Sequence, residues 1–213
     1  AKHRSIKQIN VQTADEKYDA WVKYFALADD IVFVAAVADY TPKFRSVTKI
    51  KKKQNELTIE LTKTKDIAGE LGKQKKTNQV AVGFALETND EEINATEKLK
   101  RKNFDFIVLN SLRDEGAGFQ TDTNKITIID KNGNVSKFDL KNKNEVAKDI
   151  VDYVNKIRLK NRWRLILNNL PPTTDFVQLQ FSFCFRFQPL PRNYVANEPL
   201  MPKKYLVVTQ GFL

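Results

Sequence analysis

Two groups of lysines and one aspartate have the side-chain types and spacing that suit chemistry on an anionic ligand. Lys98 and Lys102 are four residues apart in a segment with helical spacing, so both can reach one anion from the same helix face. The basic run of residues 49–53 adds further cations, and Asp39 directly follows the apolar run of residues 31–38. Cations stabilise negative charge that shifts during a reaction, and a carboxylate beyond a strand can orient a ligand.

Each of these groups also has a purely structural explanation. Lysines on an edge strand prevent edge-to-edge pairing, which suits residues 49–53. Cations in the last turn of a helix interact favourably with the helix dipole, which suits residues 98–102. Asp39 suits a turn or a helix cap as well as a ligand site. Position and charge alone leave both explanations open.

The residue inventory excludes several other kinds of site. The 213 residues include one cysteine, Cys184, and one histidine, His3, which excludes an internal disulfide, a Cys/His zinc cluster and a Ser-His-Asp site inside the domain. Neither GxGxxG nor GxxxxGK[ST] occurs, and the one G-x-G pair is Gly116 with Gly118. The longest apolar run is too short to span a membrane, and no secretory signal follows Ala1. We therefore expect a reduced, cytoplasmic protein.

The elements that must position the charged side chains alternate between strand and helix patterns. We predict strands over residues 6–11, 31–38, 57–61, 80–84, 104–109, 125–129 and 135–140, and helices over residues 13–25, 66–71, 89–102 and 145–154. Residues 31–38 are apolar on both faces, as a central parallel strand must be. The alternation predicts an α/β fold, a three-layer domain with a mainly parallel sheet.

Local motifs predict where several of these elements begin and end. Thr13 with Glu16, and Asn89 with Glu92, have the spacing of capping boxes at helix starts. Gly72 can end the helix of residues 66–71 in the left-handed region. The dipeptide at residues 132–133, Asn-Gly, predicts a type I′ hairpin turn.

Charge and proline content divide the chain near residue 156. The net charge is +10, but residues 156–213 hold nine basic and two acidic side chains, so seven of the ten charges belong to them. Six of the seven prolines also lie there. We predict a domain over residues 1–155 and a basic, Pro/Phe-rich tail over residues 156–213 outside it. Within the tail, residues 177–187 alternate between apolar and polar side chains like a strand.

Six segments, taken in order, share their sequence with one known family. They are residues 35–42, 49–52, 57–61, 82–88, 95–110 and 116–124. Together they resemble phosphopantothenoylcysteine synthetase, the ligase half of the bifunctional bacterial flavoprotein of coenzyme A biosynthesis. The match extends from residue 6 to about residue 155, and the order of the segments makes it specific.

This resemblance implies a Rossmann-like domain with a β-hairpin flap, usually a homodimer, that acts as a ligase. CTP, with Mg²⁺, activates the carboxylate of 4′-phosphopantothenate as an acyl-cytidylate, and cysteine then displaces CMP. Lys49 matches the lysine on the family's flap, which is expected to meet phosphate in the transition state. The positions that match the CTP-binding residues are Phe33, Val34, Ala35, Asp39, Lys65, Asp66, Ile67, Ala68, Phe84, Lys98 and Lys102.

Members of the family begin this domain with a glycine-containing strand and loop that the sequence lacks, and residues 156–213 match nothing in the family. The ligase interpretation therefore has two alternatives. The first is a catalytically inactive structural or assembly homologue. The second is a basic nucleic-acid-binding module, since cations and aromatic side chains can bind single strands.

Overall fold

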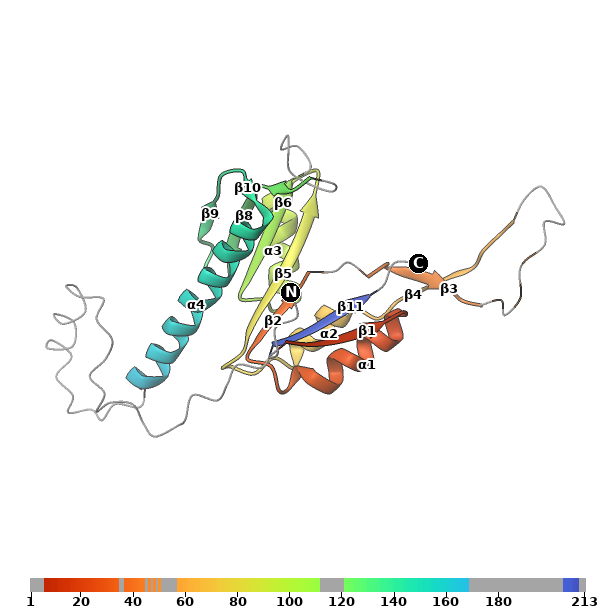
Figure 1. Ribbon diagram of the computed structural model, residues 1–213, viewed down its shortest axis with the longest axis horizontal. Helices are drawn as coiled ribbons and strands as arrows, with labels where there is room; N and C mark the ends of the chain where they lie inside the picture. Colours follow the sequence, from red (N-terminus) through yellow and green to blue (C-terminus); the bar gives the residue numbers. More distant parts are fainter. Residues whose placement is uncertain are drawn as a thin grey trace, which may run out of the picture.

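The computed structural model describes residues 6–34, 37–44, 46, 48, 50, 57–111, 121–168 and 205–210. Its centre is a five-stranded sheet in the order β2-β5-β6-β8-β9 (Figure 1). The strands are β2 (Asp30–Phe33), β5 (Val80–Glu87), β6 (Phe106–Ser111), β8 (Ile126–Asp130) and β9 (Val135–Lys137). The first three are parallel, and β8 and β9 are antiparallel to their neighbours.

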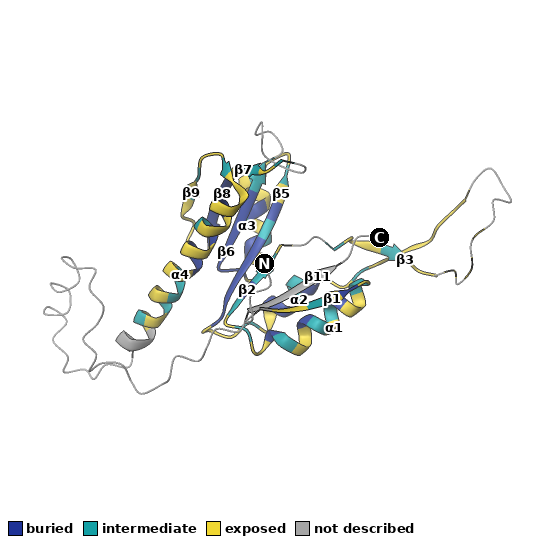
Figure 2. Ribbon diagram, in the orientation of Figure 1, coloured by how far each residue is buried: buried dark blue, intermediate teal, exposed yellow. Residues whose placement is uncertain are grey.

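Helices cover both faces of this sheet. On one face, the side chains of α4 (Lys143–Asn168) pack on Val82, Phe106 and Ile128. On the other face, α3 (Glu91–Arg101) packs on Ala85 and Leu109. Figure 2 shows β5 and β6 as the most continuously buried strands, which agrees with their unbroken apolar sequences. The predicted three-layer α/β fold with a mainly parallel sheet is confirmed.

A smaller core holds two further helices beside the edge of the sheet. Trp21 and Phe25 of α1 (Ala14–Phe25) pack with Leu71 of α2 (Ile67–Lys73) and with Ile31 of β2. The predicted capping box at Thr13 is confirmed. Its side chain accepts a hydrogen bond from the Glu16 N–H, and the Glu16 carboxylate accepts from the Thr13 N–H in return.

Three short strand pairs lie outside the main sheet. The predicted hairpin extension is formed by β3 (Tyr40–Pro42) and β4 (Leu61–Lys63), which project away from the body (Figure 1). Strands β7 (Thr123–Asn124) and β10 (Lys141–Asn142) pair with each other beside the start of α4. The third pair joins β1 (Ile6–Val11) in parallel to β11 (Tyr205–Gln210). Both strands of this third pair pack against α1.

The strand predicted over residues 31–38 differs from the observed one in length and position. Strand β2 ends at Phe33 and forms an edge of the described five-stranded sheet, so the expectation of a central strand was wrong. Ile31 is buried, but Val34 is exposed. The apolar run predicted two covered faces, but apolar character alone cannot specify how many strands lie beside it.

Four further local predictions differ from the structure. Residues 57–60 are outside the observed strand β4. Gly72 lies inside α2, which ends at Lys73 with Gln74 as its C-cap. Asp90 caps α3 with a left-handed backbone and no side-chain bond, so Asn89 forms no capping box. In the β8–β9 hairpin only Gly133 has a positive φ, whereas a type I′ turn needs two such residues.

The described helix α4 continues through residue 168, beyond its predicted end at residue 154 and across the predicted domain boundary. That boundary stays a prediction, as does the tail's independence of the domain. The strand predicted over residues 177–187 and the Gly116–Gly118 loop lie outside the described residues. Among the residues that are described, no helix has both the length and the apolar character needed to cross a membrane.

Candidate functional site: a lysine pair beside the start of α2

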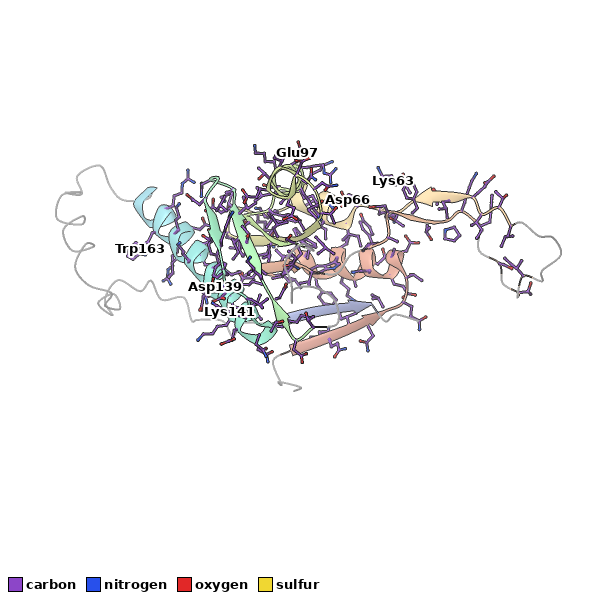
Figure 3. The ribbon with its side chains drawn as sticks, turned by 90° about the horizontal axis from the view of Figure 1, so that it is seen from above. Lys63, Asp66, Glu97, Asp139, Lys141 and Trp163 are labelled. Atoms are coloured by element: carbon purple, nitrogen blue, oxygen red, sulfur yellow. The ribbon has the colours of Figure 1, made fainter. Side chains whose placement is uncertain are left out.

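Asp66 links the start of α2 to the end of α3. Its carboxylate accepts a hydrogen bond from the Gly69 N–H at 3.1 Å and caps α2. The same oxygen, Oδ1, lies 2.7 Å from Lys102 Nζ. Figure 3 shows Asp66 on the segment that leads from Lys63, the last residue of β4, into the body of the domain. The predicted site residues Asp66 and Lys102 are therefore brought into direct contact.

The charges around Asp66 favour its ionised form. Burial raises the pKa of the Asp66 carboxyl, but the hydrogen bonds from Lys102 and Gly69 outweigh that effect, and the Lys102 and Arg101 charges add to them. The pKa of Asp66 therefore lies below its ordinary value. This carboxylate remains negative in the site, and it holds Lys102 in place.

Lys98 is one turn before Lys102 on α3 and is half-buried. Its side-chain amine has no hydrogen bond or ion pair to another described residue. Burial lowers the pKa of the Lys98 amine, and the nearby positive charges of Lys102 and Arg101 lower it further. Glu87, the last residue of β5, and Asp66 oppose the shift only in part. Lys98 is thus a cation whose charge the described protein incompletely balances.

The aromatic residues of the predicted site lie elsewhere. Phe33 packs in the core, with its ring centroid 5.1 Å from that of Trp21 and 5.7 Å from that of Phe104. Phe84 packs on the α4 face of the sheet, whereas α3 and its lysines cover the opposite face. Neighbouring residues of a strand point to opposite faces, so the Phe84 side chain lies on the face of β5 that is opposite to α3 and its lysines.

Some of the remaining predicted residues pack in the core, and others are exposed to solvent. Ile67 is buried and Ala68 packs against the α3-facing core, so both hold α2 in place. Lys65 lies with its Nζ 4.4 Å from the Tyr18 ring centroid, on the α1 side of α2. The remaining members are Val34 and Asp39, which are exposed, and Ala35 and Lys49, which lie outside the described residues.

Two charged residues of this site were not predicted. Arg101 contributes positive charge to both Asp66 and Lys98, and Glu87 contributes negative charge to Lys98. The spacing of Arg101, three residues after Lys98, was an available signal for a shared helix surface. Glu87 had no such signal, because strand pairing and helix packing together determine its distance from Lys98.

A small hollow on the same side of the sheet is separate from the lysine pair. It lies between the first turn of α3 and strands β6, β8 and β9. Its lining residues are Glu91, Glu92, Leu109, Ser111, Lys125, Thr127 and Lys137. Two of its charges already form an ion pair, with Lys137 Nζ 3.1 Å from Glu92 Oε1. Among the described residues, no group of three or more His, Cys, Asp or Glu side chains could hold a metal ion.

The arrangement of Lys98, Lys102 and Asp66 suits the binding of an anion. Two ammonium groups lie on one helix face, and only one of them has a carboxylate partner at hydrogen-bond distance. A carboxylate, sulfinate or phosphate group would balance the remaining charge. Groups of this kind can bind and orient an anion, and none of these three is a nucleophile already paired with a general base.

Known proteins resemble this chain over most of its length. Residues 1–157 match a family model described as "DNA/pantothenate metabolism flavoprotein C-terminal domain". A cysteine/cysteine sulfinic acid decarboxylase from an unknown prokaryotic organism is 56% identical over 148 residues, which cover 70% of this chain and 41% of that protein. The coenzyme A biosynthesis bifunctional protein CoaBC of Bacillus subtilis is 41% identical over 146 residues, covering 68% and 36% respectively. The chain thus spans less than half the length of these relatives.

Solved structures agree with the fold. The crystal structure of the C-terminal domain of a CoaBC protein has a TM-score of 0.56 and 35% identity, covering 70% of this chain and 66% of that chain. A DNA/pantothenate metabolism flavoprotein from Streptococcus pneumoniae has a TM-score of 0.53 at 16% identity, covering 68% of each chain, and shows the fold alone.

The comparisons contradict the functional part of the resemblance drawn from the sequence. The 56% identical relative is titled a decarboxylase, and the matching family model is described as that of a flavoprotein, so neither points to the synthetase family. CTP-dependent ligation, CTP and Mg²⁺ as cofactors, and 4′-phosphopantothenate with cysteine as ligation partners are wrong by the same finding. With 157 of its 213 residues matched, this chain belongs to the DNA/pantothenate metabolism flavoprotein C-terminal domain family.

Proposed function

We propose that this chain is part of a decarboxylase-type enzyme of coenzyme A biosynthesis. We further propose that its Lys98–Lys102 pair binds an acidic group of a small cysteine-derived substrate. The pathway follows the relatives titled coenzyme A biosynthesis proteins, and the reaction class follows the relative titled a cysteine/cysteine sulfinic acid decarboxylase. Half-buried Lys98, with its unbalanced charge, is the observation that supports the site.

The chemistry of such substrates suits a site with two cations. Cysteine carries one acidic carboxylate, and cysteine sulfinic acid carries a carboxylate and a sulfinate. When the carboxylate of cysteine sulfinic acid leaves as CO₂, the sulfinate can still hold the substrate in place. Lys98 and Lys102 can bind it by charge-assisted hydrogen bonds, and Asp66 keeps Lys102 oriented. The pair therefore has a binding and positioning role, and no bond is broken at it.

The family's description as a flavoprotein raises the question of where a flavin could bind. A phosphate-bearing cofactor needs backbone N–H groups that it can approach closely, which glycines usually allow. Among the glycines that the structure describes, Gly69, Gly72 and Gly83 are each closely approached by a neighbour, and Gly133 lies in a hairpin turn. The described residues do not fit a flavin, so we assign no step of the reaction to one.

Calorimetric titration with cysteine and with cysteine sulfinic acid tests the site directly. We expect cysteine sulfinic acid to bind, and Lys98→Met to weaken its binding by about tenfold or more, the effect of losing one charge-assisted hydrogen bond. Lys100→Met is the matched control, because Lys100 is an exposed lysine of the same helix. The Lys100→Met variant should bind cysteine sulfinic acid with the same affinity as the unaltered chain.

Release of labelled CO₂ from the two acids, with added flavin, tests the reaction class. We expect CO₂ from at least one acid, and less from Lys98→Met than from Lys100→Met. Binding that is equal in all three proteins would contradict the proposed site. Binding that depends on Lys98, without CO₂ release from either acid, would contradict the decarboxylase assignment and leave the anion site in place.

A further inference from the structure

Lys98 differs from the other lysines of its helix in how the protein surrounds it. Lys102 is held at 2.7 Å by Asp66, and Lys100 is exposed to solvent. Lys98 is half-buried, and its amine has no hydrogen-bond or ion-pair partner among the described residues, while two positive charges, Lys102 and Arg101, act on it. Its amine is therefore accessible, poorly solvated and close to like charge.

These surroundings have two chemical consequences. Partial burial and like charge both favour the neutral amine, which is the nucleophilic form of a lysine. The burial and the neighbouring charges lower the pKa of Lys98 below its ordinary value. The same charges, on Lys102 and Arg101, attract a negatively charged reagent to the amine. A nucleophile and an anion-attracting surface are thus combined at one side chain.

We propose that Lys98 is a site of covalent acylation by small activated acyl donors that carry phosphate. Acyl thioesters of phosphate-bearing thiols and acyl phosphates share this chemistry. The neutral Nζ attacks the acyl carbonyl carbon, and a C–N bond forms while the C–S or C–O bond to the leaving group breaks. The thiolate or phosphate departs with the electron pair, and the amine proton passes to it or to water. The product is a neutral amide, so one positive charge is lost.

The inference goes beyond the proposed function, because it needs only the reactivity of Lys98 and no decarboxylation. It also has a consequence for that function. An acylated Lys98 cannot donate as a cation, so acylation would weaken any anion binding at the pair. The two proposals therefore fail separately: Lys98 can react without binding substrate, and it can bind substrate without reacting.

The test is the rate of acetylation of each lysine, measured by mass spectrometry in the full chain. Acetyl phosphate and acetyl-CoA are used in separate arms, which distinguishes an acyl phosphate from a thioester as the donor. We expect Lys98 to be labelled faster than Lys100 at pH 7.5, because burial and the nearby positive charges favour the neutral amine of Lys98. Equal rates at Lys98 and Lys100 with both donors would overturn the proposal.

Variants of Lys102 separate reactivity from simple exposure. Lys102→Met removes a positive charge beside Lys98, so labelling of Lys98 should slow and its pH profile should move to higher pH. Lys102→Arg keeps the charge and should keep both the rate and the profile. Lys100→Met, on the exposed side of the helix, is the control for the loss of any lysine. If the acetylation rate of Lys98 is unchanged or higher in Lys102→Met, the mechanism is contradicted. Greater exposure of Lys98 alone would raise that rate.

Discussion

Asp105 is a buried carboxylate that holds the starts of two central strands together. It lies 2.9 Å from Lys75 Nζ and 2.6 Å from Lys131 Nζ, and it accepts the Ala81 N–H at 2.9 Å. Lys75 is almost fully buried, whereas 47% of the Lys131 side chain is exposed. The two ion pairs therefore differ in what remains unpaired when one partner is removed.

We expect Asp105→Asn to lower the free energy of unfolding by about 3 kcal/mol, because the buried Lys75 charge loses its partner. Urea denaturation measures this directly. Lys131→Met is the matched control and should cost less than Asp105→Asn, since Lys131 is half exposed and the buried Lys75 keeps Asp105 as its partner. Equal losses in the two variants would show that Lys75 is not buried in solution.

The pH dependence of the same residue follows from its pKa. Burial raises the pKa of Asp105, but the hydrogen bonds from Lys131, the Ala81 N–H and Lys75 lower it below its ordinary value. The stability that Asp105 contributes is therefore complete above its unfolded pKa of about 3.9 and is lost as pH falls through the folded value. The difference in unfolding free energy between the unaltered chain and Asp105→Asn should be constant above about pH 5 and shrink below pH 4. A difference that grows on acidification would contradict the direction of the shift.

Helices α2 and α3 approach each other closely at one glycine. A Cβ atom on Gly72 would lie 2.0 Å from the Lys102 carbonyl oxygen, which belongs to the backbone and cannot rotate away. Asn103 adds a hydrogen bond from its side-chain amide to the Gly72 carbonyl at 2.9 Å. The glycine inside α2 is thus explained by packing and not by helix termination.

Gly72→Ala should lower the free energy of unfolding by about 1–3 kcal/mol, as overpacking of a close contact does. It should also move α2 away from α3 and lengthen the contact between Asp66 and Lys102. Chemical denaturation and the Lys102 side-chain NMR signals measure the two effects. Gly133→Ala is a control with nothing within 4 Å, in which only the positive φ costs energy, about 1 kcal/mol. If Gly133→Ala is the more destabilising variant, the close helix contact does not exist.

The elements were predictable from the sequence where a local signal determines them. The capping box of Thr13 and Glu16 involves only neighbours in sequence, and the apolar strands β5 and β6 are buried on both faces as their sequences require. The position of β2 at the sheet edge was not predictable, because it depends on which other strands pair with it. Gly72 was misread for the same reason, since its neighbour Lys102 is distant in sequence.

The candidate site was predicted in part. Four-residue spacing correctly placed Lys98 and Lys102 on one helix face, and the structure adds Asp66 to them. The family resemblance grouped Phe84 with the lysines, although Phe84 lies on the other face of the sheet. Sequence position indicates which residues belong to a strand, but only the packing of helices on the sheet shows which face meets a ligand.

One strand pair joins segments that are far apart in the sequence. Strand β1 pairs with β11, and neither belongs to the described five-stranded sheet. A chain ending at residue 168 should therefore keep amide protection in β5, β6 and β8, which have their hydrogen-bond partners within residues 1–168. It should lose amide protection in β1. Hydrogen exchange measures both, and loss of protection in β5 would show that the predicted tail belongs to the domain.

The β1–β11 pairing can form only after most of the sequence has been synthesised. Ile6 pairs with Tyr205, so the ribosome adds 199 residues after Ile6 (205 less 6) before its partner has been made. At roughly 5–20 residues per second, this takes about 10–40 s. During that time β1 lacks β11 as a partner, while all strands of the described five-stranded sheet have been made by residue 137. The pairing of β1 with β11 is consequently among the last strand contacts that synthesis allows.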